Sequence, residues 1–175
     1  LYEKPFEYVE AHVKPARATN PRTNRRERWW IHGETGAGWR AVTSGISRFI
    51  ATSRVAKFRN FVWFNAVCWP SDAVVGIARA DDTTFGLLQS RFHELWSLRM
   101  GTFLGVGNDP RYTPTTCFET FPFPEDLTPA DTAHQQTEAV PGSAHGALIP
   151  AQIADPALKA AATRIAEAAA RLNAL

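Results

Sequence analysis

The stretch RYTPTTCFETFPFP (residues 111–124) decides how the chain is organised, because simple core-building patterns do not account for it. It contains three prolines, and each X-Pro step pushes the preceding residue into an extended conformation. The stretch therefore predicts a stiff extended ribbon rather than a helix, with Phe118, Phe121 and Phe123 anchored on a core. The turn-rich segment GVGNDP (residues 105–110) lies immediately before it. We expect the ribbon to present this polar tip as a recognition loop.

The segment before the tip predicts a helix. Apolar side chains recur at helical spacing over residues 85–100, which indicates one buried stripe. The preceding residues 81–84 (DDTT) offer N-cap candidates, and Gly101 is a typical helix terminator.

Residues further upstream predict a sheet. The runs 49–52 and 58–67 are rich in β-branched and aromatic residues, and 73–78 is another short apolar run. Because the turn WPSD (residues 69–72) separates the last two runs, we expect an antiparallel hairpin over residues 58–78. The predicted fold class is α+β, a twisted and largely antiparallel sheet packed on helices, followed by a C-terminal helix.

Composition divides the 175 residues into four parts. Residues 1–28 mix prolines with a dense arginine cluster and predict a connector, whereas residues 29–127 predict the folded domain. Residues 128–150 have almost no large apolar side chain and predict a flexible linker. Residues 151–175 predict the start of a C-terminal helical segment, capped at Asp155. Without an initiator Met, the chain is expected to be a piece of a longer protein.

Charge is spread unevenly along the chain. The net charge is +2, yet residues 1–60 carry 12 Lys and Arg against 5 Asp and Glu, a net of +7 that the remainder offsets with −5. A basic half is typical of a face that binds a polyanion, although a solvated surface has the same composition.

The sequence gives little support to a metal site, a membrane span or a secretory signal. Cys68 and Cys117 lie far apart among apolar neighbours, without the spacing of a zinc site, so we expect buried free thiols and no metal. No apolar run approaches the roughly 20 residues of a spanning helix, and no secretory signal opens the chain. A soluble protein of the bacterial cytoplasm is expected.

Three segments carry a resemblance to a known family. The segments RFIATSRVAKFRNFVWF (48–64), LQSRFHELWSLRMGTFLGVGNDP (88–110) and RYTPTTCFETFPFP (111–124) together resemble the target-recognition region of MmeI-like type IIL restriction-modification enzymes. Related class I SAM-dependent adenine DNA methyltransferases share the likeness, which covers roughly residues 29–124. It implies sequence-specific recognition of double-stranded DNA, next to methyltransferase and helical domains of the same polypeptide.

The resemblance implies chemistry outside this sequence. The family's methyl-transfer motif, Asn or Asp followed by Pro-Pro and an aromatic residue, is absent here. We therefore expect no catalysis by this fragment, with SAM bound by a missing methyltransferase domain that methylates adenine N6. The glycine pair of residues 105–107 lacks the strand, helix and acidic partner of a cofactor-binding turn.

Three polar loops are candidates for DNA contacts, because readout needs short loops whose side chains reach base edges. They are residues 52–59, 69–72 and 107–111, and the family's base-discriminating positions fall near the third. The residues expected to contact bases are Ser71, Asp72, Asn108, Asp109 and Arg111. Those expected to contact phosphates are Arg25, Arg26, Ser53, Arg54, Lys57 and Arg59. The assignment of bases to residues stays open, as does a purely structural role for Arg111 or for the first two turns.

Two other functions remain open at this point. One is a protein-interaction module of the same polypeptide, without base readout. The other is a small stand-alone enzyme that uses His93 and Glu94, which have neither a nucleophile nor an orienting partner nearby in sequence.

Overall fold

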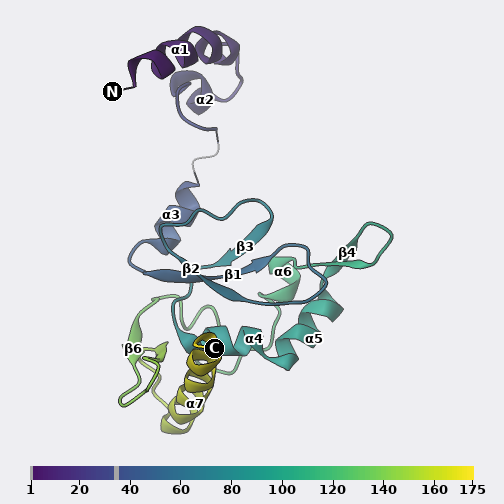
Figure 1. Cartoon of the computed structure of the whole chain (residues 1–175), viewed down its shortest axis with the longest axis vertical. Coiled ribbons are helices and arrows are strands. Elements are labelled where there is room, and N and C mark those ends of the chain that lie inside the picture. The colour runs from purple at the N-terminus through teal and green to yellow at the C-terminus, as the bar shows by residue number, and fades with distance from the viewer. Residues whose placement is uncertain (1, 34–35) are drawn as a thin grey trace. The chain divides into compact units, whose positions relative to one another are not determined.

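The computed structural model describes residues 2–33 and 36–175, and it divides into two compact units, residues 1–42 and 43–175 (Figure 1). The first unit contains helices α1 (Glu3–Arg17) and α2 (Thr23–Glu27) and most of α3 (Ala37–Thr43). Arg17 donates from Nη1 to the carbonyl oxygens of Trp29 (2.7 Å) and Ile31 (2.6 Å). The connector expected at residues 1–28 is therefore largely helical.

The second unit is built on a three-stranded antiparallel sheet with the order β2-β1-β3. Its strands are β1 (Arg48–Ser53), β2 (Val62–Asn65) and β3 (Val74–Ile77), and Ile50 of β1 pairs with Trp63 on one side and Ile77 on the other. The α+β class is confirmed, but the hairpin expected over residues 58–78 is wrong. Strand β1, which has four consecutive buried residues, occupies the centre and separates the two strands expected to pair.

Residues 85–100 form two helices rather than one, α4 (Asp82–Gln89) and α5 (Arg91–Met100). Ser90 between them is extended, with φ −69° and ψ 153°, and its side chain accepts from the backbone N–H of His93 at 3.2 Å. Serine favours such a cap over a helix interior. The change of direction leaves Phe92, which was expected in the buried stripe, 81% exposed.

The segment that follows α5 forms a two-stranded ribbon and a short helix. Strands β4 (Thr102–Leu104) and β5 (Asp109–Arg111) pair antiparallel, and α6 (Pro114–Cys117) comes next. The prediction of a continuous extended stretch is thus wrong at Pro114, which opens α6 at a position where proline is favoured because no N–H is needed there. Phe118 and Phe123 pack against the main core, as predicted.

Residues 128–150 contain a second hairpin instead of the expected linker. Strands β6 (Thr137–Ala139) and β7 (Leu148–Pro150) pair antiparallel, and Val140, Ala147 and Ile149 are buried against α7 (Pro156–Asn173). The average composition of residues 128–150 is polar, so it does not reveal these three buried apolar residues. A few apolar side chains suffice because α7 offers a face of small residues. The alanines buried on that face are Ala162, Ala166, Ala169 and Ala170.

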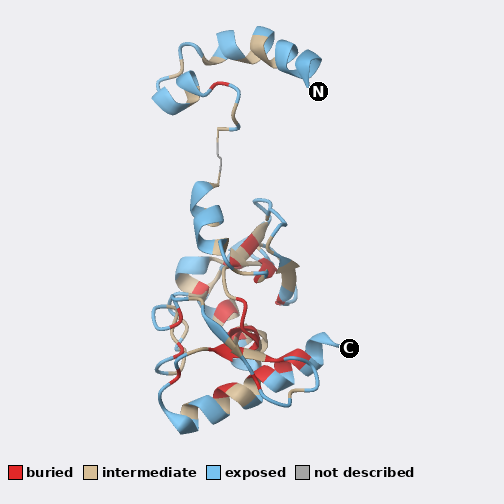
Figure 2. Ribbon diagram, turned by 90° about the vertical axis from the view of Figure 1, so that its left-hand side faces the viewer, coloured by how far each residue is buried: buried red, intermediate tan, exposed pale blue. Residues whose placement is uncertain are grey.

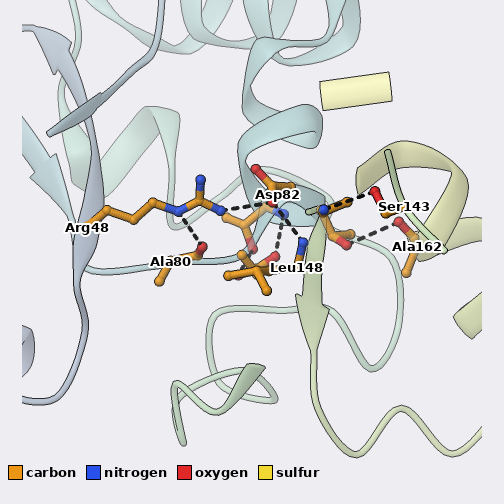
Figure 3. A network of polar contacts seen from close by, with 10 residues as sticks. Arg48, Ala80, Asp82, Ser143, Leu148 and Ala162 are labelled. Carbon is orange, nitrogen blue, oxygen red and sulfur yellow. Dashed lines mark hydrogen bonds and ion pairs between the residues drawn. The ribbon is translucent and has the colours of Figure 1, made fainter. Parts of the chain in front are cut away.

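Asp82 joins these layers (Figure 3). Its carboxylate is buried, and Oδ2 accepts from Arg48 of β1 and from the backbone N–H of Leu148 in β7, both at 2.8 Å. The next residue, Thr83, donates from Oγ1 to the carbonyl oxygen of Ala162 in α7 at 3.1 Å. A buried charge is tolerated only when paired and hydrogen-bonded, as this one is.

The main core lies between the sheet and α4, where Ile50, Phe61, Phe85 and Leu88 are buried. Figure 2 colours the buried segments of the second unit red. Tyr112 and Cys117 extend this core toward the ribbon. Cys117 is a buried free thiol, as predicted, whereas Cys68 is exposed because it lies in a turn beyond the end of β2.

Candidate nucleic-acid interface

The three predicted loops converge at the end of β1. Arg54 of the first loop is hydrogen-bonded next to both of the other loops. Its N–H donates to the carbonyl oxygen of Ala73, directly after residues 69–72, at 2.8 Å. Its carbonyl oxygen accepts from the N–H of Tyr112, directly after residues 107–111, at 2.7 Å. The N–H of Ala56 donates to the carbonyl oxygen of Pro110 at 3.1 Å. The first loop therefore runs beside both the turn before β3 and strand β5.

These bonds make the first loop a continuation of the ribbon sheet. Val55 forms an antiparallel bridge with Arg111, which pairs in turn with Thr102 of β4. The β4–β5 ribbon is thereby fixed at its base, while its far end projects from the second unit (Figure 1).

The ribbon ends in a tight turn that two glycines make possible. Gly105 and Gly107 have φ of 64° and 90°, a region that residues with a Cβ rarely adopt. Asn108 and Asp109 are exposed next to them. Their side-chain oxygens lie 3.4 and 3.3 Å from the position that a Cβ on Gly105 would take, so both side chains gather over this glycine.

The second loop is tied to the first by an exposed ion pair. Arg54 donates from Nε to the carbonyl oxygen of Asp72 at 2.6 Å, and from Nη2 to its fully exposed carboxylate at 3.1 Å. Ser71, beside it, is also exposed. Exposed pairs are worth little in water, so Arg54 and Asp72 can exchange this contact for others.

Arg59 does not fit the predicted role at a phosphate. It is only 8% exposed, and Nη1 donates to Oγ1 of Thr52 (3.1 Å) and to the carbonyl oxygen of Ser53. Nη2 reaches the carbonyl oxygen of Pro110 at 3.5 Å, and the guanidinium lies over the ring of Tyr112. Burial lowers the pKa of Arg59. The side chain braces the first loop against the ribbon instead.

The other predicted phosphate contacts fall into two groups. Ser53 and Lys57 are exposed beside the ribbon, and Lys57 lies 5.6 Å from the ring centroid of exposed Phe58. Arg25 and Arg26 belong to the first unit, where Arg26 donates to the carbonyl oxygen of Asn20 at 2.9 Å.

The two residues of the stand-alone enzyme hypothesis are not placed for acid-base chemistry. His93 is fully buried, and Nε2 shares a hydrogen bond of 3.0 Å with the hydroxyl of Tyr112. Burial, and then the charge of Arg59, lower the pKa of His93 to about 4. Glu94 faces outward in an ion pair with Arg91 at 2.5 Å. That hypothesis is wrong, because the two side chains share no accessible site.

Sequence reasoning missed the support behind the loops. The RYT motif alone indicates no role for Tyr112, yet the buried hydroxyl and ring of this residue connect His93 and Arg59. A tyrosine directly before an X-Pro step, next to a basic loop residue, is the signal that could have suggested it.

Other site types are not represented in the described part of the chain. Residues 2–33 and 36–175 contain no cluster of His, Cys, Asp and Glu that could hold a metal ion. Within the same ranges, no helix has the length and apolar character needed to cross a membrane. Gly105 and Gly107 form the turn of a β-ribbon, so they do not precede a helix as a cofactor-binding glycine turn does.

The comparison with known families supports a role in DNA recognition. Residues 40–125 match the family described as "MmeI, target recognition domain". This part of the chain belongs to that family. The matched range contains all three loops, the central sheet and helices α4 to α6. No curated protein and no solved structure matches the chain.

The MmeI-type recognition domain is a non-catalytic specificity module with a role in DNA recognition in restriction-modification enzymes. The match to this family begins at residue 40, later than the expected start at Trp29. It ends at residue 125, directly after the proline-aromatic stretch, as the resemblance predicted. The β6–β7 hairpin and α7 lie outside the match, although they are packed into the same compact unit.

Proposed function

We propose that this chain selects the DNA sequence for a SAM-dependent adenine-N6 methyltransferase of the MmeI type, by direct base readout from the tip of the β4–β5 ribbon. The observation that carries the proposal is the convergence of three polar loops on one projecting ribbon within a target recognition domain. In the parent enzyme this module holds the duplex while a separate domain acts on the extruded adenine.

The β4–β5 ribbon has the side chains that base readout requires, with Asn108 and Asp109 at its tip and Arg111 at its base. An asparagine pairs with adenine through two hydrogen bonds, aspartate accepts from the cytosine amino group, and arginine forks onto guanine. Asn108, Asp109 and Arg111 supply one of each. A good contact of this kind is worth about 1 to 3 kcal/mol of discrimination.

Phosphate contacts set the register of the domain on the duplex. Lys57 and Ser53 are exposed beside the ribbon, and Arg54 is released once its surface pair with Asp72 opens. Arg25 and Arg26 would contribute from the first unit. SAM would supply the methyl group within the methyltransferase domain, and no residue of this chain is assigned to hold it.

Changing Asn108 or Asp109 tests base readout. We expect Asn108→Ala and Asp109→Asn, each made in the intact parent enzyme, to relax or shift one position of the methylated sequence while methylation continues, because each change removes about 1 to 3 kcal/mol of discrimination. Genome-wide mapping of methylated adenines measures this. Glu125→Gln, an exposed carboxylate outside the three loops, is the matched control. An unchanged motif in both variants would contradict the proposal.

Lys57→Ala tests the phosphate contact separately. We expect weaker binding to matched and unmatched duplexes alike, and a salt dependence of log K that is smaller by about one unit of slope, because one fewer counterion is released. Titrations of the intact enzyme at several salt concentrations provide the slopes. Lys159→Ala on α7, where Lys159 pairs with Glu138, is the control and keeps the wild-type slope. If Lys57→Ala and Lys159→Ala had the same salt dependence of log K, Lys57 would not contact a phosphate.

One observation favours a protein-interaction role in addition. Phe92 is 81% exposed beside an apolar groove formed by α4, α7 and the proline-aromatic stretch. If the module served only such contacts, the methylated sequence would not respond to changes in the ribbon tip.

A further inference from the structure

The β4–β5 ribbon has two faces, and the strand register assigns its side chains to them. Leu104 pairs with Asp109, and Thr102 pairs with Arg111, so these four side chains lie on one face. Val55 joins the same face through its bridge to Arg111. Here this set is called the outward face.

The outward face points away from the core. Tyr112 follows Arg111 and is buried in the core, and successive side chains of a strand point to opposite sides. Phe103 and Pro110 pair on the face that Tyr112 shares. The outward face therefore places Asp109 and Arg111 beside two aliphatic side chains, Leu104 (41% exposed) and Val55 (38%).

The protein covers these two aliphatic side chains only in part. They are partly exposed on a projecting ribbon, and Val106 at the tip is 94% exposed. Exposed apolar side chains interleaved with base-reading polar groups have a natural counterpart in duplex DNA. The major groove admits a two-stranded β-ribbon, and its apolar feature is the 5-methyl group of thymine.

We propose that Leu104 and Val55 read thymine methyl groups in the major groove, beside the polar contacts of Asp109 and Arg111. The inference rests on the proposed function and adds a substrate feature, the thymine methyl, that the polar loops do not detect. Any recognised sequence that contains adenine also contains a thymine in the partner strand, so the feature is present at every site of the proposed methyltransferase.

The test replaces each thymine of the mapped site in turn by deoxyuridine, which removes only the methyl group, and measures the Kd of the intact enzyme. Loss of one buried methyl predicts about a fourfold weaker Kd at one or more positions. Leu104→Ser or Val55→Ser should abolish this difference. Phe103→Ser is the matched control, since Phe103 is the neighbour of Leu104, has similar exposure (49%) and lies on the opposite face.

Three results would overturn the inference. They are equal affinity for thymine and deoxyuridine at every position, a difference that survives both outward-face variants, and a difference that Phe103→Ser abolishes equally. If the serine variants fold poorly, Leu104→Ala and Val55→Ala allow the same comparison. If one of the three overturning results is found while the wild-type enzyme still prefers the mapped site, the proposed function stands. A wild-type enzyme without sequence preference would refute the proposed function itself.

Discussion

The free energy of unfolding is expected to fall more steeply between about pH 7 and pH 4.5 in the wild-type chain than in a His93→Gln variant. His93 is fully buried with a pKa lowered to about 4, whereas an unfolded chain titrates near 6.5. Between these values the unfolded state binds a proton that the native state does not. Protonation therefore favours unfolding as the pH falls from 6.5 toward 4.

The magnitude of this effect is about 2 to 3 kcal/mol at pH 4.5, from about 1.4 kcal/mol per pKa unit. Glutamine does not titrate and can still hydrogen-bond to Tyr112. Denaturant titrations of wild type and His93→Gln at pH 7 and pH 4.5 measure how far the free energy of unfolding falls between the two pH values. His145→Gln, an exposed histidine, is the control and should behave as wild type. Parallel pH profiles for wild type and His93→Gln would show that His93 is not held neutral by burial.

Gly86→Ala is expected to destabilise the second unit by about 1 to 3 kcal/mol, despite the better helix propensity of alanine. Helices α4 and α7 approach closely at this glycine. A Cβ there would lie 2.6 Å from Cγ2 of Ile165, 3.2 Å from its carbonyl oxygen and 3.2 Å from the Cβ of Ala169. Thermal or denaturant unfolding measures the loss.

The close approach to Ile165 can be tested directly with a second substitution. In a double-mutant cycle, Ile165→Ala removes the nearest atom, so Gly86→Ala should cost less in that background. Gly38→Ala in α3 is a helical control, since no described residue lies within 4 Å of the new methyl group, and it should be neutral or stabilising. A full cost of Gly86→Ala in the Ile165→Ala background would contradict the close packing of α4 and α7.

Local patterns in the sequence predict the elements better than their pairing. The apolar run that became β1 was identified, but its central position was not, because pairing depends on which strand is buried on both faces. The break at Ser90 was missed because helical spacing continues across it while the side chain caps the next helix. The hairpin before α7 was missed because its buried residues are few and separated in sequence.

The candidate site could be predicted as three loops but not as one assembly. Loop composition indicated three polar loops, and the structure joins the first loop to the base of the β4–β5 ribbon and to the turn before β3 through backbone bonds of Arg54, Ala56 and Tyr112. Such bonds depend on the backbone and leave no signature in side-chain pattern. For the same reason Arg59 was expected at a phosphate, since its burial is visible only once the ribbon lies over it.

The most direct test is the structure of the intact parent enzyme bound to the duplex that it methylates. Our account predicts the ribbon tip in a groove, with side-chain atoms of Asn108, Asp109 or Arg111 about 3 Å from base edges. A complex in which this tip faces solvent, away from every nucleotide, would contradict it.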